Sequence, residues 1–334
     1  MNSTIAIKMR RQVRRPSLLL ELYFKDDIEL GKLASNVLQP MSHLLSGVVL
    51  TFKTKKSLEE NPAAAAQLTS AFPQIAVHAV WSSKIAYVGT GKRARGAFDT
   101  RQDATFNTLT TYAKGLMASS PQIQSILLVS GTGQKKSLCS VECLRQVSSD
   151  LRETCGIHVG CAFNPALGGS LDPDPDSEGA IERERSRLRS KLMSGRVSTV
   201  WINFSADVAA VREGLGYLKC LEAELKDSIT TPLRLIGSIF VPSTSWLAKM
   251  RFRCWSGCFL GPKTSSDSDS SDYLSSVDAA TRITSDLLKV YQSYGVEPLV
   301  ESSVRTRREA EECVSFLRSV GMLQHDDCLQ SDAS

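Results

Sequence analysis

The sequence predicts a single α/β domain in which eight parallel strands, each followed by a helix, close into a (β/α)8 barrel. Short apolar runs rich in β-branched residues alternate with longer segments of helical periodicity along most of the 334 residues. The runs are apolar on both faces, as in a parallel sheet that helices cover on both sides. Eight such units in a chain of this length match a TIM barrel. A doubly wound open sheet is the alternative, but the first turn, YFKDDIE, has no glycine.

The strands are read from apolar runs that turn residues separate, beginning with LLLELYF, GVVLTFK and IAVHAVWS. The predicted strands are Leu18–Phe24, Gly47–Lys53, Ile75–Ser82, Ile123–Ser130, Ile157–Phe163, Thr199–Asn203, Arg234–Phe240 and Gly295–Val300. Helical spacing of apolar residues between these runs predicts the helices, and the charged helix before the sixth strand stops at Ser194-Gly195. The predicted helices cover residues 29–45, 57–71, 103–119, 140–154, 178–194, 206–226, 243–251 with 275–293, and 305–320.

Domain boundaries follow from changes in composition. We expect a basic tail or presequence over residues 1–16, the barrel over 17–322 and a C-terminal tail over 323–334. Three loops interrupt the strand–helix rhythm and lie near the C-terminal ends of strands, which is the functional face of a barrel. They are the basic GTGKRARGAF (89–98), which is not a Walker loop, the Pro/Asp-rich GGSLDPDPDSEG (168–179), and the Ser/Asp insertion PKTSSDSDSSDY (262–273), which we expect to be mobile.

Charge and composition narrow the function classes. Residues are 42% hydrophobic, and no apolar run reaches the ~20 residues that a membrane span needs. The net charge of +5 comes largely from the first 20 residues, so bulk charge gives no argument for nucleic acid. That segment, MNSTIAIKMRRQVRRPS, is basic and free of acids, which is typical of a mitochondrial transit peptide; a basic tail on a cytoplasmic protein is the alternative. The nine cysteines show no zinc-knuckle spacing, so no metal is predicted.

Polar side chains at the C-terminal tips of barrel strands converge on one mouth. The sequence places these there: Glu21, Thr51, Lys53, His78, Ser130, Thr132, Asn164, Asn203, Ser243, Thr244 and Glu301. Glu21 stands inside an apolar strand, where an unpaired charge would cost several kcal/mol. It is therefore either an ion-pair partner of a residue such as Lys53 or a carboxyl of raised pKa that can act as a general acid. A satisfied core histidine is the alternative reading of His78.

In their order along the chain, several of these motifs resemble the catalytic, FAD-binding TIM barrel of the methylenetetrahydrofolate reductase family. LLELYFK is similar to the family's S-F-E-F-F-P-P and keeps the acid as Glu21, without the prolines. VLTFK keeps Thr51 of V-T-Y-G, and VHAVWS keeps His78 of the H-L-T-C strand. KLMSGRVSTVWINFSAD places Asn203 where the family has a folate-contacting glutamine, and PLRLIGSIFVP resembles the next strand.

Two stretches depart from the family pattern. The flavin-contacting L-R-G-D after the fourth strand becomes VSGT, with Ser130 and Thr132 in place of the arginine and aspartate. The Y-P-E-x-H-P stretch after the fifth strand becomes FNPALGG, which begins at Phe163 and includes Asn164. The chain is therefore identified as a divergent member.

The resemblance implies a reductase that passes hydride from NAD(P)H through FAD to 5,10-methylenetetrahydrofolate. It assigns Glu21 as the general acid, Asn203 to the folate, and Thr51, His78, Ser130, Thr132 and Asn164 to the cofactor. The alternative is a catalytically inactive barrel retained as a binding or assembly module, because a fold does not carry its function with it. A third hypothesis is a related barrel that holds phosphates with GKRARG. The expected location is the mitochondrion or the cytoplasm, and self-association or an assembly partner is left open.

Overall fold

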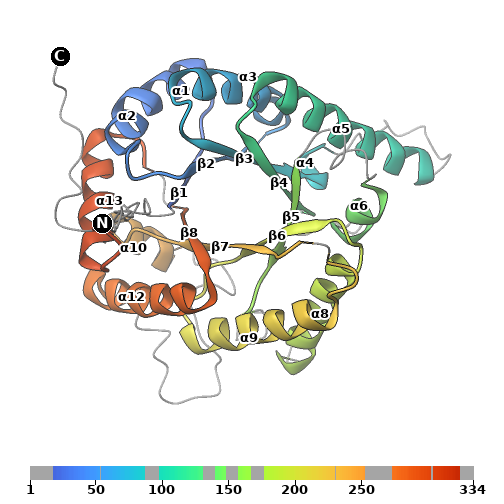
Figure 1. Cartoon of the computed structure of the whole chain (residues 1–334). Helices are drawn as coiled ribbons and strands as arrows, with labels where there is room; N and C mark the ends of the chain where they lie inside the picture. Colours follow the sequence, from blue (N-terminus) through green and yellow to red (C-terminus); the bar gives the residue numbers. More distant parts are fainter. Residues whose placement is uncertain are drawn as a thin grey trace, which may run out of the picture.

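Eight parallel strands form a closed barrel in the order β1 to β8, and helices surround it (Figure 1). The computed structural model describes residues 18–52, 54–86, 98–130, 140–147, 157–166, 177–229, 231–252, 273–301 and 304–323. The predicted barrel is therefore confirmed. The basic N-terminal segment, the C-terminal tail beyond 323, Lys53, Thr132 and most of the three unusual loops lie outside the described residues.

The strands are shorter than predicted at most ends, because only the paired core of each apolar run belongs to the barrel. Their bounds are β1 Leu19–Leu22, β2 Gly47–Leu50, β3 Ala76–Ser82, β4 Ile123–Val129, β5 His158–Phe163, β6 Val197–Ile202, β7 Arg234–Ile239 and β8 Val296–Val300. β6 begins two residues earlier than predicted. β8 begins after Gly295, because this glycine has a φ of 67° and ends the preceding helix in the left-handed conformation.

The helices lie outside the barrel in the predicted order. Their bounds are α1 Asp27–Leu33, α2 Gln39–Met41, α3 Lys55–Ala71, α4 Ser83–Ala86, α5 Phe98–Ser119, α6 Ser140–Gln146, α8 Ser177–Leu192, α9 Val208–Glu224, α10 Thr244–Phe252, α12 Val277–Tyr294 and α13 Arg307–Ser319. A π-helical turn, η1 (Ala34–Leu38), separates α1 from α2 where one continuous helix was expected. Pro40 follows it directly, and proline cannot donate the backbone hydrogen bond that a regular helix needs.

Local sequence signals fix where several helices begin. Thr306 and Glu309 form a reciprocal capping box at the start of α13, and Thr54 with Ser57 does the same for α3. Asp207 accepts a hydrogen bond from the Ala210 amide at the start of α9. These caps satisfy backbone donors at the helix starts, so each helix begins directly after the loop that leaves the C-terminal end of a strand.

The strand registers arrange the inward side chains in layers of four, taken from alternate strands, as in other barrels of this kind. The middle layer is apolar and consists of Val49, Leu127, Trp201 and Leu299. Leu19 and Ile236 pack against it from the layer beneath. Gly160 also lies in that lower layer, where a Cβ would sit 2.6 Å from the Trp201 indole nitrogen. The barrel centre is thus packed with side chains and separates two polar ends.

A larger apolar core lies between the barrel and its helices. Outward residues of the strands, such as Leu20, Leu50 and Ile202, are completely buried against the helix faces. Burial of this kind supplies roughly 25 cal/mol for each Å² of apolar surface removed from water. The helical shell therefore stabilises the strands and leaves the two barrel ends free to carry polar groups.

Candidate functional site

The C-terminal mouth of the barrel carries two successive layers that are rich in polar groups. The strand registers place Glu21 and Ser238 in the first layer above the apolar one, together with Val80 and Ala162. They place Thr51, Asn203 and Glu301 in the next layer, with Val129. Four predicted mouth residues, Glu21, Thr51, Asn203 and Glu301, are thereby brought to one end of the barrel. In barrels of this architecture catalytic groups lie at that end.

Glu21 points into the barrel because Leu19, two residues earlier on β1, belongs to the interior cluster. Its side chain is half-buried, so it can reach both protein groups and a molecule in the mouth. The alternative role of Glu21, an ion pair with a residue such as Lys53, stays a prediction, because Lys53 lies outside the described residues.

Asn203 directly follows β6 and is exposed at the mouth. Its backbone amide donates to the Phe163 carbonyl at 2.9 Å, which extends the β5–β6 pairing and fixes the position of the residue. Its side-chain amide makes no hydrogen bond with the described part of the chain. A free carboxamide offers two donors and an acceptor to a ligand.

Glu301 and Ser238 form a second polar contact at the mouth, and Ser238 was not among the predicted site residues. The Ser238 hydroxyl donates to a Glu301 carboxyl oxygen at 2.6 Å. Burial raises the pKa of Glu301, and the hydrogen bond from Ser238 opposes that shift. Only the alternation of β7, which turns Ser238 to the same side as Ile236, could have indicated this serine.

The described residues that the resemblance assigns to FAD make hydrogen bonds within the protein. The Thr51 hydroxyl donates to the Leu22 carbonyl at 3.1 Å. The Ser130 hydroxyl accepts from the Ser140 amide at 2.7 Å, next to the start of α6. The Asn164 carboxamide oxygen accepts from the Ala166 amide at 3.1 Å. These hydrogen bonds hold the three side chains against strand ends and turns. Each side chain keeps further hydrogen-bonding groups, since a hydroxyl or carboxamide can make more than one hydrogen bond. Their contacts with FAD therefore stay a prediction. Thr132 lies outside the described residues.

His78 lies lower than expected, because β3 begins at Ala76 and the histidine is only its third residue. It is completely buried in the layer beneath the apolar one, where its Nδ1 contacts the Ser125 hydroxyl at 2.7 Å. Its ring meets that of Trp201 edge to face. Burial first, and then the charges of Arg234 and His158, lower the pKa of His78 to about 3. The imidazole is therefore neutral near pH 7 and separated from the mouth.

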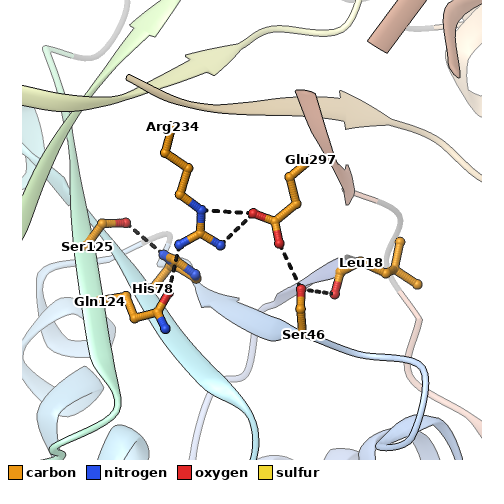
Figure 2. Close-up of polar contacts among 7 residues, drawn as sticks. All are labelled: Leu18, Ser46, His78, Gln124, Ser125, Arg234 and Glu297. Atoms are coloured by element: carbon orange, nitrogen blue, oxygen red, sulfur yellow. Dashed lines mark hydrogen bonds and ion pairs between the residues drawn. The ribbon is translucent and has the colours of Figure 1, made fainter. Parts of the chain in front are cut away.

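Below His78, a polar network closes the N-terminal end of the barrel (Figure 2). Arg234 on β7 donates through Nε and Nη2 to one oxygen of Glu297 on β8, and through Nη1 to the side-chain Oε1 of Gln124 on β4. The other oxygen of Glu297 accepts from the Ser46 hydroxyl at 2.9 Å. This hydroxyl also lies 3.0 Å from the Leu18 carbonyl oxygen. Contacts that span β1, β2, β4, β7 and β8 are suited to holding the barrel closed.

A cavity of about 620 Å³ lies beside this network, between β7, β8, α12 and the end of α13. Its lining includes Arg234, Lys289 and Glu297. The cavity is on the N-terminal side, where residues of these barrels generally serve stability. We therefore place the candidate site at the opposite mouth.

Within the described ranges, no cluster of three or more His, Cys, Asp or Glu could hold a metal ion. No described helix is long and apolar enough to cross a membrane.

Aromatic side chains that follow β6 and β7 pack with others from α10 and the segment just before α12 in the apolar core. Phe204 and Phe240 meet edge to face with ring centroids 5.0 Å apart, and Trp246 stacks on Phe240 at 5.1 Å. Phe204 also contacts Tyr273. Sequence reasoning had not singled out these rings. Pairs of this geometry contribute beyond simple burial, so they stabilise the core around the segments that follow β6 and β7.

Comparison with known proteins adds fold-level similarities only. No family model and no curated protein matches the sequence. The carboxyl transferase domain of Rhizobium etli pyruvate carboxylase is 10% identical, with a TM-score of 0.45 over 96% of this chain and 49% of that one. This chain thus spans about half the length of that protein. A Clostridium difficile type I 3-dehydroquinate dehydratase is 12% identical, with a TM-score of 0.36 over 67% of this chain and 75% of that one. A Rhizomucor miehei beta-1,3-glucanosyltransferase is 11% identical, with a TM-score of 0.45 over 86% of this chain and 87% of that one.

Proposed function

We propose that the C-terminal mouth is an acid–base site for a small heterocyclic substrate. On the sequence resemblance, we propose that this substrate is 5,10-methylenetetrahydrofolate and that the reaction is its reduction. The observation that carries the proposal is the position of Glu21 and Asn203 in adjacent layers at the C-terminal ends of β1 and β6. A carboxyl and a free carboxamide in one mouth can donate a proton and orient a ring at the same time.

In this proposal each residue has one role. The carboxyl of Glu21 donates a proton to a ring nitrogen of the methylene-folate, which opens the ring to the iminium form that accepts hydride. Asn203 pairs with the donor and acceptor edge of the pterin. No described residue supplies the hydride.

The resemblance implies that FAD, reduced by NAD(P)H, supplies this hydride, and both cofactors stay predictions. Thr51, Ser130 and Asn164 are engaged within the protein, so we assign no step of the reaction to a flavin held by them. The departures VSGT and FNPALGG from the family's flavin-contacting stretches favour a second candidate, a barrel that binds a ligand at its mouth without turnover. Self-association or an assembly partner belongs to this second candidate as well.

Purified full-length protein distinguishes the two candidates. The reductase proposal predicts a yellow protein, or one that binds added FAD, and NAD(P)H-dependent reduction of methylene-folate. In Glu21→Gln, reduction of the folate should fall about 10²–10⁴-fold while any hydride transfer from NAD(P)H to flavin persists, because only the folate step needs the acid. Glu312→Gln is the matched control, since Glu312 lies on the outer helix α13. A colourless protein that binds no FAD and reduces no folate contradicts the reductase and supports the binding module.

The location of the protein is a separate proposal that rests on its N-terminal composition. Residues 1–17 carry five basic residues and no acid, so we propose mitochondrial import. Fusion of this segment to a fluorescent reporter should direct the reporter to mitochondria. A diffuse cytoplasmic signal, with the arginines intact, would contradict import.

A further inference from the structure

Glu21 and Glu301 occupy neighbouring positions on adjacent strands. β1 and β8 pair in parallel, with Leu19 opposite Leu299 and Leu20 opposite Val300. The next residues in this register are Glu21 and Glu301. The Glu301 amide donates to the Ile239 carbonyl at 3.0 Å, so β8 keeps its pairing with β7 at this position. Adjacent strands lie about 4.8 Å apart, which makes the two glutamates direct neighbours.

Both side chains face the interior of the barrel. Leu19 and Leu299 belong to the interior cluster, and side chains two residues further along a strand point to the same side. The carboxyl groups of Glu21 and Glu301 are therefore held on one side of the sheet, at the mouth. Two carboxylates at neighbouring positions on one side of a sheet repel each other, so ionisation of one makes ionisation of the other less favourable.

Neutral groups hold Glu301 in place. The Ser238 hydroxyl donates to its carboxyl at 2.6 Å, and Ser238 is buried. The Tyr291 hydroxyl from α12 in turn donates to the Ser238 carbonyl at 3.1 Å. Burial, followed by the neighbouring Glu301, raises the pKa of Tyr291, so this tyrosine stays neutral near pH 7. The Ser238 hydroxyl of β7 therefore contacts Glu301 directly, and Tyr291 of α12 holds the backbone of Ser238.

We propose that Glu21 and Glu301 form a carboxyl pair that holds one shared proton near neutral pH, with Glu301 as the positioning residue that keeps Glu21 able to donate it. The raised pKa of Glu301, caused by burial, is consistent with the pair. The inference rests on the proposed function only for the identity of the proton acceptor. When Glu21 transfers its proton to a ring nitrogen of the substrate, the pair becomes doubly ionised. It then regains one proton from water at the mouth.

The test measures the titration of the pair directly, without turnover. Full-length protein carrying glutamate labelled with ¹³C at the side-chain carboxyl is titrated by NMR, as wild type, Glu301→Gln, Ser238→Ala and Glu312→Gln. The pair predicts that the midpoint of Glu21 falls by about one pH unit or more in Glu301→Gln, because the neighbouring negative charge is removed. Glu312→Gln should leave it unchanged, since Glu312 lies on the outer helix.

Ser238→Ala provides a milder variant if the Glu301 substitution disturbs folding. Loss of the hydroxyl donor removes a hydrogen bond that favours ionised Glu301, so the midpoint of Glu301 should rise. An unchanged Glu21 midpoint in a folded Glu301→Gln protein overturns the pair, as does a Glu21 that is already fully ionised at pH 5 in wild type. If the titrations show the pair while wild type reduces no methylene-folate, the proposed substrate fails and the pair stands.

Discussion

Arg234 and Glu297 join the last two strands of the barrel across its N-terminal end. The guanidinium donates to one carboxylate oxygen through Nε at 2.9 Å and Nη2 at 2.5 Å, while Nη1 reaches Gln124 on β4 at 2.7 Å (Figure 2). β7 and β8 are thus tied both to each other and to the far side of the barrel. The Arg234 side chain is 34% exposed and that of Glu297 is 10% exposed, so solvent screens this ion pair less than a surface ion pair.

The first prediction concerns this pair. Arg234→Met and Glu297→Gln should each lower the free energy of unfolding by about 1–3 kcal/mol, because each leaves a partly buried partner without its counter-charge. The double variant should cost clearly less than the sum of the two. Arg308→Met is the control, because Arg308 and Glu312 form an ion pair on α13 in which the side chains are 87% and 47% exposed. This variant should lower the free energy of unfolding by at most about 0.5 kcal/mol. Denaturant unfolding measures all four, and strict additivity would contradict the coupling.

The second prediction is a loss of stability in mild acid through His78. Burial lowers the pKa of His78 to about 3 in the folded protein, against an ordinary value of about 6.5 for a histidine in the unfolded chain. Between these values the unfolded chain binds a proton that the folded protein excludes, so stability falls as the pH drops below 6.5. The loss by pH 5 is about 2 kcal/mol, at 1.36 kcal/mol for each pKa unit.

Urea unfolding at several pH values between 7 and 5 measures this dependence. His78→Gln should lose most of it, since an amide can still contact Ser125 and does not titrate. Arg234 and His158 are the charged groups that act on the imidazole. In Arg234→Met the pKa of the folded imidazole should rise toward its ordinary value, while burial still holds it low. An equal slope in wild type and His78→Gln would show that other groups cause the acid sensitivity.

How far the sequence predicts this molecule depends on the range of each interaction. Alternation and strand ends placed Glu21, Thr51 and Asn203 at one mouth, because these signals are local. The contact of Ser238 with Glu301 joins residues 63 positions apart and depends on how β7 pairs with β8. The sequence listed Glu301 among the mouth residues but could not give it a partner.

His78 shows a second limit. The apolar run around it indicates a strand, but not where pairing starts, and one layer of the barrel corresponds to one or two residues of strand. Because β3 begins at Ala76, His78 lies beneath the apolar layer and not at the mouth. The position of Gly295 was equally undecided from the sequence, since a glycine between a helix and a strand can end the helix or begin the strand. Its φ of 67° decides in favour of the helix end.

The third prediction tests the packing of the barrel centre. In Gly160→Ala the new Cβ would lie 2.6 Å from Trp201 Nε1 and 3.0 Å from its Cδ1, so the indole or β5 must shift. We expect a loss of about 1–3 kcal/mol in the free energy of unfolding, as in other overpacked cores. Gly31→Ala on α1 is the matched control, because nothing lies within 4 Å of its Cβ. It should raise stability by up to about 1 kcal/mol. Thermal unfolding of both variants measures these changes. A Gly160→Ala protein as stable as wild type would contradict the close packing around Trp201.

The last prediction concerns Asn203, whose amide is exposed and makes no side-chain hydrogen bond within the described ranges. Asn203→Ala should leave the melting temperature unchanged, because no side-chain hydrogen bond within the described part of the chain is lost. If the amide pairs with the pterin edge, the dissociation constant for methylene-folate should rise about tenfold, which corresponds to one lost hydrogen bond of about 1.4 kcal/mol.

Titration calorimetry with methylene-folate measures this constant in wild type and variants, and it applies whether or not the protein turns the substrate over. Gln292→Ala removes an exposed amide from α12 beside the N-terminal cavity and serves as the control. Asn203→Gln should bind at least as well as wild type, since the longer side chain reaches further into the mouth. Equal affinity in wild type and Asn203→Ala would remove Asn203 from the site, and a loss in Gln292→Ala alone would move the site to the opposite end of the barrel.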